Sequence, residues 1–351
     1  MGMRKILPTL KSYCYIRILP LFTRSEDNLP QKDGEQPIAV ICDPMTLHNI
    51  SQAHTSISLT PRYWKKAFEN TRPKFLFCEA AWSGAWRGQI YRDRRVFYEN
   101  RKYLTAILDK CRAENIATVF WAKEDPAYFE HNIYDFTDTA LMFDYILTTA
   151  EECITAYRAL GHKQVYLWPF GFSEDTFYPP EANQPREPAA VFAGSWYKEH
   201  SERCKDLEEI FDTVLAAGIK LRIYDRYRKA GRSAKPFPLK YQPYVQDAVA
   251  YSDLGEIYRR AEYAINVNTV CGSETMFARR VYEAMACGSL IISNESKGMR
   301  RQFGDSVWFI GNEFDFSSKE IIRNKNIEAV FKDHTRKQRM EQLYTMIGCD
   351  K

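Results

Sequence analysis

The sequence predicts an α/β protein built from two doubly wound, Rossmann-like domains that face a cleft. Short apolar segments alternate along the chain with segments of helical period. The apolar segments lack a polar–apolar alternation, which is typical of strands in a parallel sheet covered on both faces. Residues 179–188, PPEANQPREP, interrupt this pattern with four prolines, and the pattern then starts again. We therefore expect a hinge at 179–188 between two domains of similar fold.

The composition is consistent with this class of protein. At 351 residues the chain is long enough for two domains of ordinary size. Hydrophobic residues make up 45% and charged residues 27%, as in soluble globular proteins. The formal net charge of +4 suits anionic small molecules or a membrane surface, but it is too small to indicate nucleic-acid binding. The nine cysteines form no CxxC pair, so we expect reduced thiols in a cytoplasmic protein.

Residues 1–36 are expected to form a basic leader and a linker. The first part is basic and apolar, but Lys11 and Arg17 interrupt it and no signal-peptide cleavage pattern follows. No apolar run in the sequence reaches the ~18–20 residues that a membrane span requires. The expected location is cytoplasmic, with a peripheral contact of residues 1–22 at the inner face of the membrane as an alternative.

The first domain is expected over residues 37–178. Its clearest helix carries Leu104, Ile107 and Leu108 on one face, which is the spacing of an amphipathic helix. The two other helices end at a proline and at a glycine, as helices commonly do. Strands are predicted at 37–43, 74–82, 117–126, 143–149 and 163–170, and helices at 60–73, 100–116 and 150–161.

The second domain is expected over residues 189–324, followed by a C-terminal helical segment at 325–351. Its strands are again short, most of them are apolar, and each is followed by a helical pattern. Strands are predicted at 189–196, 220–225, 263–268, 289–294 and 306–311, and helices at 204–218, 253–261, 276–288, 296–304 and 325–347.

Doubly wound sheets bind ligands at the carboxyl ends of their strands, so the loops there are the candidate sites. The loop at 193–205 contains Gly194 and Ser195 after a strand, and Arg203 and Lys205 at the start of the next helix. Small residues allow a phosphate close to the backbone, and the helix start and the guanidinium supply positive charge. The alternative is an ordinary turn with solvated charges.

A second loop precedes the predicted helix at 276–288. Gly272, Ser273, Glu274 and Thr275 are expected to cap this helix and to expose unpaired N–H groups. Arg279 and Arg280 follow in its first turns, and Glu283 lies one turn further on. These groups could bind a diphosphate and a ribose diol. The alternative is an Arg–Glu helical pair worth a few tenths of a kcal/mol.

Two loops of the first domain carry carboxylates at strand ends. Glu124 and Asp125 precede Pro126, and could bind or deprotonate an acceptor hydroxyl. Residues 78–88 contain Glu79, Trp82 and Trp86, a mixture of carboxylate and aromatic side chains that suits a carbohydrate. The alternative is a polar loop with an Asp-Pro turn.

Several common motifs are missing from the sequence. It contains no GxxxxGK[ST], GxGxxG, HExxH or GxSxG, and no Asp-x-Asp at a predicted strand end. The six histidines show no metal-ligand spacing. A phosphate site that needs no metal and uses backbone, Arg and Lys groups is the interpretation that remains.

The ordered motifs resemble one family, the CgeB-like glycosyltransferases, named after a spore maturation protein. They belong to the nucleotide-sugar transferases of the GT-B fold, with two Rossmann domains. The likeness runs from about residue 37 to the end of the chain. It rests on CEAAWSGAW, VFWAKEDPAYFE, FDYILTTAEECITAYRALGHKQVYLWPFG, VFAGSW, ARRVYEAMACGSLIISN and DHTRKQRMEQLYTMIG.

The resemblance implies sugar transfer from a nucleotide donor, bound by the C-terminal half, to a hydroxyl acceptor, bound by the N-terminal half. Glu283 matches the glutamate that holds the ribose diol in related retaining transferases. Those relatives place a second glutamate eight positions earlier, where this chain has Thr275 beside Glu274. The family commonly has Asn and His where this chain has Ala122 and Tyr128, so acceptor details do not carry over.

We therefore expect a retaining, metal-independent transferase that uses a UDP- or GDP-sugar and has no tightly bound cofactor. The acceptor would be a glycan, a lipid-linked molecule or a protein in cell-surface polysaccharide biosynthesis. Two alternatives remain open, a teichoic-acid-type phosphate transferase with His131 as base and a non-catalytic glycan-binding coat protein. The expected residues are Glu124, Asp125 and Glu274 for catalysis; Gly194, Ser195, Arg203, Lys205, Tyr244, Val245, Ser273, Thr275, Arg279, Arg280 and Glu283 for the donor, with Tyr244 and Val245 beside the base; and Glu79, Trp82 and Trp86 for the acceptor.

Overall fold

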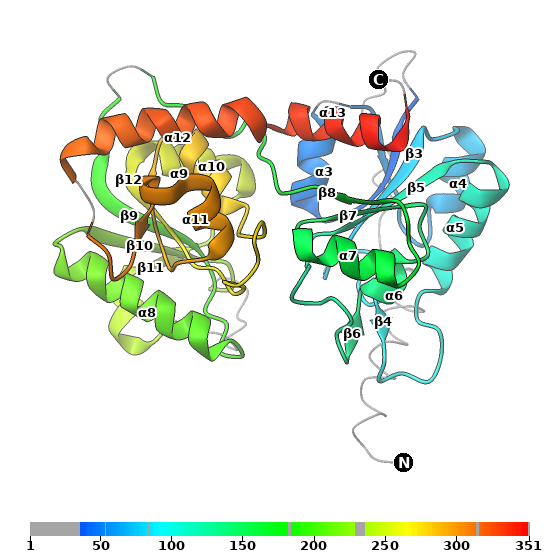
Figure 1. Cartoon of the computed structure of the whole chain (residues 1–351), viewed down its shortest axis with the longest axis horizontal. Coiled ribbons are helices and arrows are strands. Elements are labelled where there is room, and N and C mark those ends of the chain that lie inside the picture. The colour runs from blue at the N-terminus through cyan, green and yellow to red at the C-terminus, as the bar shows by residue number, and fades with distance from the viewer. Residues whose placement is uncertain are drawn as a thin grey trace. The chain divides into compact units, whose positions relative to one another are not determined.

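The computed structural model describes residues 36–52, 54–82, 84–181, 184–228, 236–313 and 316–349. The chain forms two compact units (Figure 1). Unit 1 contains the described residues up to Pro169 and those from Met340 onward, and unit 2 runs from Phe170 to Arg339. The leader predicted at 1–36, with its membrane contact at 1–22, lies outside the described residues except for Gln36. No helix within the described ranges is long and apolar enough to cross a membrane.

Unit 1 contains a six-stranded parallel sheet in the order β2-β1-β3-β5-β7-β8. Every residue of β1 and of β3 is buried, which explains why these strands are apolar except for Glu79 at the end of β3. The strands are β1 (Ile38–Ile41), β2 (Ser56–Ser58), β3 (Phe75–Glu79), β5 (Ala117–Ala122), β7 (Tyr145–Thr148) and β8 (Val165–Leu167), and the antiparallel pair β4 (Arg92–Asp93) and β6 (Tyr134–Asp135) lies outside the sheet.

The helices of unit 1 follow the predicted amphipathic pattern where that pattern is strong. Leu104, Ile107 and Leu108 are all buried, as predicted. The sequence analysis missed the first helix, in which Asp43 caps the N-terminus by accepting from the N–H groups of Met45 and Thr46. The helices are α3 (Pro44–Ser51), α4 (Trp64–Asn70), α5 (Lys102–Ala113), α6 (Thr137–Ala140) and α7 (Glu151–Ala159).

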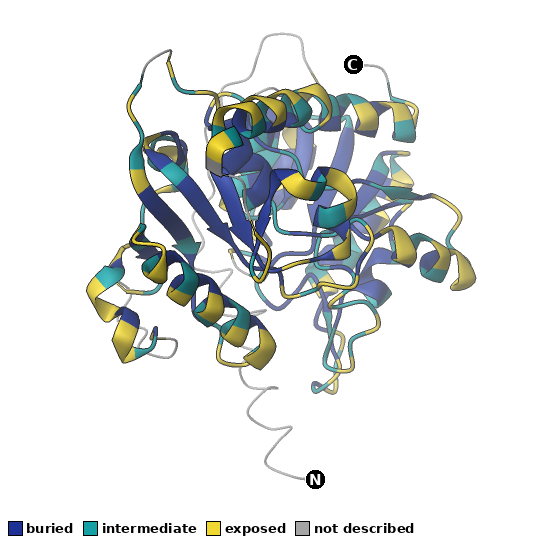
Figure 2. Cartoon of the chain, turned by 60° about the vertical axis from the view of Figure 1, so that its left-hand side comes forward, coloured by how far each residue is buried: buried dark blue, intermediate teal, exposed yellow. Residues whose placement is uncertain are grey.

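Unit 2 contains a second six-stranded parallel sheet, in the order β11-β10-β9-β12-β13-β14. Hydrophobic clusters cover both faces of this sheet, and Figure 2 shows buried strands beneath helices whose outer faces are exposed. Two such sheets confirm the predicted fold class. The strands are β9 (Glu187–Gly194), β10 (Lys220–Asp225), β11 (Val245–Asp247), β12 (Ala261–Asn266), β13 (Leu290–Ser293) and β14 (Trp308–Phe309).

Helices and 3-10 turns connect these strands, and two further helices follow the last strand; the second of them, α13, begins in unit 2 and continues into unit 1. The principal helices are α8 (Ser201–Ala216), α9 (Leu254–Arg260), α10 (Arg280–Ala286), α11 (Lys297–Phe303), α12 (Lys319–Asp333) and α13 (Arg336–Ile347), and the 3-10 turns are η2 (Leu239–Tyr244), η3 (Tyr251–Asp253), η4 (Gly304–Ser306) and η5 (Phe316–Ser318).

The chain enters unit 2 ahead of the predicted hinge. Phe172 and Phe177 are fully buried in the core of unit 2, which places residues 170–178 with this unit. The N–H of Phe172 donates to the carbonyl of His334 at 3.1 Å, so the entering segment pairs with the segment by which the chain leaves. At Gly171 a Cβ atom would lie 2.9 Å from the His334 oxygen, and this close approach requires glycine.

The single closing helix predicted at 325–347 is wrong, because the structure contains two helices there. α12 ends at Asp333, and α13 begins at Arg336. Thr335 and Gln338 form a capping box: the Thr335 hydroxyl accepts from the Gln338 N–H, and the Gln338 side chain accepts from the Thr335 N–H at 2.8 Å. This TRKQ signature is visible in the sequence, but the sequence analysis missed it.

Candidate functional site

The carboxyl end of β9 places a glycine between two arginine side chains. Gly194 is the last residue of this strand. The carbonyl of Ala193 accepts a hydrogen bond from Arg280 Nη2 at 2.7 Å, and the carbonyl of Ser195 accepts from Arg203 Nη1 at 3.2 Å. A Cβ atom on Gly194 would lie 3.2 Å from Arg280 Nη2, so the absence of a side chain allows this arginine to reach the strand.

Arg203 and Arg280 form a closely spaced positive pair. Burial, and then the charge of Arg280, lowers the pKa of the Arg203 guanidinium to about 10. Among the described residues, neither arginine forms an ion pair with a carboxylate. The buried Ser195 hydroxyl has no hydrogen-bond partner there either. Two cations and an unpaired hydroxyl at the carboxyl end of a parallel strand are suited to bind an anion such as a phosphate.

The segment before α10 is not the helix cap that the sequence predicted. α10 begins at Arg280 rather than near Met276, so residues 272–275 do not cap it. Instead the Ser273 hydroxyl accepts from the Met276 N–H at 3.0 Å and forms a local turn. Phe277 is buried in the core of unit 2, and this packing holds the segment out of the helix.

Buried asparagines hold this segment in place. The Asn268 N–H donates to Asn294 Oδ1 at 2.8 Å, and Asn268 Oδ1 accepts from the Ala278 N–H at 3.3 Å. Asn294 Nδ2 donates in turn to Asp206 Oδ2 at 2.6 Å. The sequence analysis missed these residues. The available signal was that an asparagine is the last residue of each of two predicted strands, YAINVN and SLIISN.

Glu283 and Arg279 form an ion pair one helical turn apart, which is one of the two alternatives that the sequence allowed. Arg279 Nε lies 3.0 Å from Glu283 Oε1, and both side chains are largely buried. The Tyr251 hydroxyl donates to the same oxygen at 2.7 Å. The structure therefore separates the two arginines, because Arg279 contacts Glu283 while Arg280 contacts β9.

Other predicted donor-side residues make separate contacts. Lys205 is exposed and pairs with Glu202 at 2.8 Å on the surface of α8. Glu274 is exposed and pairs with Lys297 at 3.2 Å. Tyr244 is half-buried at the end of η2, and the Val245 side chain is buried at the start of the edge strand β11. Thr275 lies half-buried in the segment described above.

In unit 1 the structure brings Glu124 together with Trp82. Burial raises the pKa of Glu124, while the charge of Lys123 and a hydrogen bond with Trp82 lower it. Trp82 is partly exposed and packs edge-on against Tyr128 and Phe136, with ring centroids 4.7 and 4.9 Å away. A carboxylate beside a partly exposed aromatic group can contact both a hydroxyl and the apolar face of a sugar.

The other predicted residues of unit 1 lie in the interior. Asp125 is 1% exposed, and its carboxylate accepts from the Thr148 hydroxyl at 2.7 Å. Burial raises the pKa of Asp125 to about 7. Trp86 is buried and donates its indole N–H to the carbonyl of Leu59 at 2.6 Å. These contacts hold the loops that carry Glu124 and Trp82.

Glu79 belongs to a buried charge cluster at the carboxyl ends of β1, β3 and β5. Its Oε1 accepts from the Asp43 N–H and lies 3.0 Å from Lys123 Nζ, and its Oε2 accepts from the Thr46 hydroxyl at 2.7 Å. Lys123 Nζ also pairs with Asp43 at 2.6 Å. Glu79 is therefore fully buried with both oxygens occupied, and burial raises its pKa to about 7.

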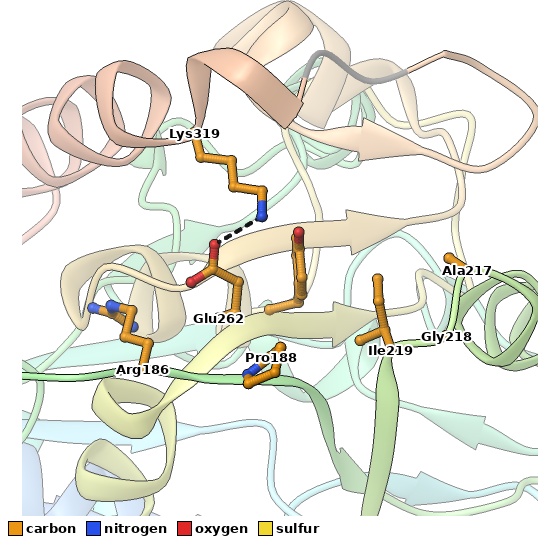
Figure 3. A pocket seen from close by; sticks show the side chains of 8 residues that line it. Arg186, Pro188, Ala217, Gly218, Ile219, Glu262 and Lys319 are labelled. Atoms are coloured by element: carbon orange, nitrogen blue, oxygen red, sulfur yellow. Dashed lines mark ion pairs between the residues drawn. The ribbon is translucent and has the colours of Figure 1, made fainter.

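A pocket of about 540 Å³ lies at the opposite edge of the unit 2 sheet, at the amino-terminal ends of β9, β10 and β12 (Figure 3). Lys319 and Glu262 form an ion pair at 3.3 Å across it. Arg186, which also lines it, donates to the carbonyls of Tyr258, Ala261 and Cys287 and so has a structural role.

In the ranges that the structure describes, no group of three or more His, Cys, Asp or Glu residues could hold a metal ion.

Comparison with known proteins found one family model and several solved structures that are similar to this chain. Residues 205–345 match a family model described as glycosyl transferase-like. HepE from Anabaena, solved in complex with UDP-glucose, is 11% identical, with 89% of this chain and 91% of that chain covered and a TM-score of 0.54. An α-glucosyltransferase, solved in complex with UDP-glucose and DNA containing an abasic site, is 10% identical, with 84% and 85% covered and a TM-score of 0.56.

A glycosyltransferase from Rickettsia africae is 11% identical, with 89% of this chain and 90% of that chain covered and a TM-score of 0.50. A match to TarM covers only 54% of that protein's chain. No curated protein matches the sequence. The structural likenesses show the fold, two parallel-sheet Rossmann-like domains, as the sequence analysis predicted.

Proposed function

We propose that this chain transfers a sugar from a nucleoside-diphosphate sugar to a hydroxyl group of an acceptor. The observation that carries the proposal is the pair of Arg203 and Arg280 on either side of Gly194. Neither cation forms an ion pair with a carboxylate among the described residues, although the charge of Glu199 acts on Arg203, and a diphosphate would supply the missing counter-charge. The family-model match over residues 205–345 supports the same chemistry.

The donor would lie along the carboxyl edge of the unit 2 sheet. Arg203, Arg280 and the unpaired Ser195 hydroxyl would bind the diphosphate, with Gly194 allowing the phosphate close to the backbone. Glu283 would accept from the ribose. We further propose a UDP- or GDP-sugar as donor, with the base near Tyr244 and Val245, and contributions to diphosphate binding from Ser273, Thr275 and Arg279.

The reaction we propose retains the configuration of the sugar and requires no metal. The bond between the anomeric carbon and the diphosphate oxygen breaks, and a bond from that carbon to the acceptor oxygen forms on the same face. The acceptor proton passes to the departing phosphate oxygen. Arg203 and Arg280 would stabilise the negative charge that develops on the leaving group. The protein otherwise contributes the orientation of the two substrates.

The acceptor would bind to unit 1 at Trp82 and Glu124. A sugar ring of the acceptor would stack on the exposed part of the Trp82 indole, and its hydroxyl would donate to the Glu124 carboxylate. We propose that the acceptor is a glycan, a lipid-linked molecule or a protein in cell-surface polysaccharide synthesis, and that the reaction takes place on the cytoplasmic side. This part of the proposal rests on the resemblance to the CgeB-like glycosyltransferases. His131, the base of the alternative phosphate transfer, uses Nδ1 to accept from the N–H groups of Ile133 and Tyr134.

Calorimetric titration with UDP, GDP, ADP and CDP in the presence of EDTA tests the donor site. We expect one nucleotide to bind the wild type, with an affinity at least about tenfold lower in Arg280→Met, because a hydrogen-bonded charge partner of the diphosphate is lost. Arg260→Met is the matched control, since Arg260 is exposed and pairs with Glu256 on α9. If none of the four nucleotides binds the wild type, the proposed donor site is wrong.

A further inference from the structure

Tyr251 connects the buried Glu283 carboxylate to a different part of unit 2. Its hydroxyl donates to Glu283 Oε1 at 2.7 Å from the first residue of η3, 32 residues earlier in the sequence. Glu283 is 4% exposed, so this contact lies within a largely buried environment. A hydrogen bond to a charged carboxylate in such an environment is stronger than one between neutral groups.

Ring packing holds Tyr251 in position. The tyrosine ring lies 5.4 Å from the Phe177 ring at an interplanar angle of 66°, and Phe177 is fully buried. The Arg279 guanidinium also lies 5.6 Å from the Tyr251 ring centroid. The packed ring therefore fixes the direction of the hydroxyl toward Glu283.

Both protein donors converge on one oxygen of Glu283. The Tyr251 hydroxyl and Arg279 Nε both contact Oε1, at 2.7 and 3.0 Å. Oε2 accepts no hydrogen bond from any residue that the structure describes. An ionised carboxylate can accept at both oxygens, so Oε2 keeps its full capacity to accept from a ligand.

We propose that Tyr251 is a positioning residue that orients Glu283 so that Oε2 meets the ribose hydroxyls of the donor. Arg279 compensates the charge of Glu283 from the same helix, whereas Tyr251 fixes the direction of the carboxylate from outside that helix. Tyr251 thereby sets the preference for a ribonucleotide over the corresponding 2′-deoxyribonucleotide. This inference rests on the proposed function, because it takes Glu283 as the ribose ligand.

The test compares UDP with 2′-deoxy-UDP and GDP with 2′-deoxy-GDP by calorimetry. We expect the wild type to bind the ribonucleotide of one pair more tightly than its 2′-deoxy counterpart. In Tyr251→Phe this affinity ratio should fall by about tenfold, since a misoriented carboxylate no longer distinguishes the missing hydroxyl. Binding of the 2′-deoxynucleotide itself should change less. Tyr178→Phe, which removes a hydroxyl from a 44% exposed tyrosine of unit 2, is the matched control.

The possible outcomes distinguish a failure of this inference from a failure of the proposed function. An unchanged or larger ratio in Tyr251→Phe overturns the role of Tyr251, while nucleotide binding by the wild type leaves the donor site standing. A wild type that binds nucleotides without preferring the ribose form also overturns the inference. A wild type that binds none of them overturns the proposed function. If Tyr251→Phe does not fold, Glu283→Gln provides the test, and an undiminished ribose preference in that variant overturns the inference.

Discussion

Arg203 and Arg280 donate to the carbonyl oxygens on the two sides of Gly194, at Ser195 and Ala193. Burial, and to a smaller extent the charge of Arg280, lowers the pKa of Arg203 to about 10. Proteins rarely bury like charges without a partner, and such pairs occur where a ligand supplies the opposite charge. This relationship is the physical basis for the proposed donor site.

Gly194→Ala should weaken nucleotide binding by about tenfold or more. The new Cβ would lie 2.7 Å from the Phe192 ring and 3.2 Å from Arg280 Nη2, so the arginine must move from its place beside β9. The measurement is the dissociation constant of the nucleotide that binds the wild type. A double-mutant cycle with Arg280→Met checks the cause, because the two losses should be far from additive if both act through Arg280. Additive losses would contradict this explanation.

Glu283→Ala should reduce nucleotide affinity severely, by about tenfold to a hundredfold. The substitution removes the ribose ligand and leaves Arg279 and the Tyr251 hydroxyl without their shared partner. Calorimetry measures the affinity, and the melting temperature shows whether the fold is retained. Glu202→Ala, on the exposed surface of α8, is the control carboxylate. Wild-type affinity and turnover in Glu283→Ala would remove Glu283 from the donor site.

The fold could be predicted from the sequence because a strand that is buried on both faces of a parallel sheet can be identified from its own apolar residues. Residues 74–82 and 289–294 contain apolar runs of the kind found in a sheet covered on both faces, and they form β3 and β13. The predicted helix start at Met276 was wrong because the true start depends on contacts with distant residues. Its start depends on the burial of Phe277 and on the contact of Asn268 with the Ala278 N–H, and neither is visible in the local pattern.

The sequence indicated which types of residue could form the candidate site, but it did not indicate which partner each side chain contacts. Glu124 and Asp125 are neighbours with the same chemistry, yet only Asp125 is nine-tenths buried, and its carboxylate accepts a hydrogen bond from the Thr148 hydroxyl on β7. Trp82 and Trp86 differ in the same way, since the indole of Trp86 donates to Leu59 from a distant part of the chain. Whether a side chain faces a ligand or the core depends on these long-range contacts.

Glu124→Gln should spare nucleotide binding and lower the transfer rate. The amide keeps the size of the side chain and its place beside Trp82, but it has no negative charge with which to bind and orient the acceptor hydroxyl. The rate is measured with the nucleotide sugar that binding identifies, across a range of pH. Because burial raises the pKa of Glu124, the acidic limb of the wild-type profile should lie above the range of a free carboxyl. Glu130→Gln in the same loop is the control, and unchanged transfer in Glu124→Gln would exclude this role.

Asp125 should make the protein less stable as the pH rises from about 4 to about 7. Burial raises its pKa from 3.8 to about 7, so the folded state binds more protons than the unfolded state between these values. The resulting stability is fully present below the unfolded pKa and is lost as the pH rises through the folded pKa. Glu79 acts in the same direction, with a pKa of about 7.

The expected effect for Asp125 is on the order of 2 kcal/mol in the free energy of unfolding across this pH range. Asp125→Asn should reduce the pH dependence, because the amide oxygen still accepts from the Thr148 hydroxyl while the titrating group is gone. Urea unfolding at pH 5 and pH 7.5 measures this difference. Asp109→Asn, an exposed carboxylate paired with Arg112, should leave the pH dependence of the wild type unchanged. An equal pH dependence in Asp125→Asn and the wild type would show that Asp125 is ionised in the folded protein throughout this range.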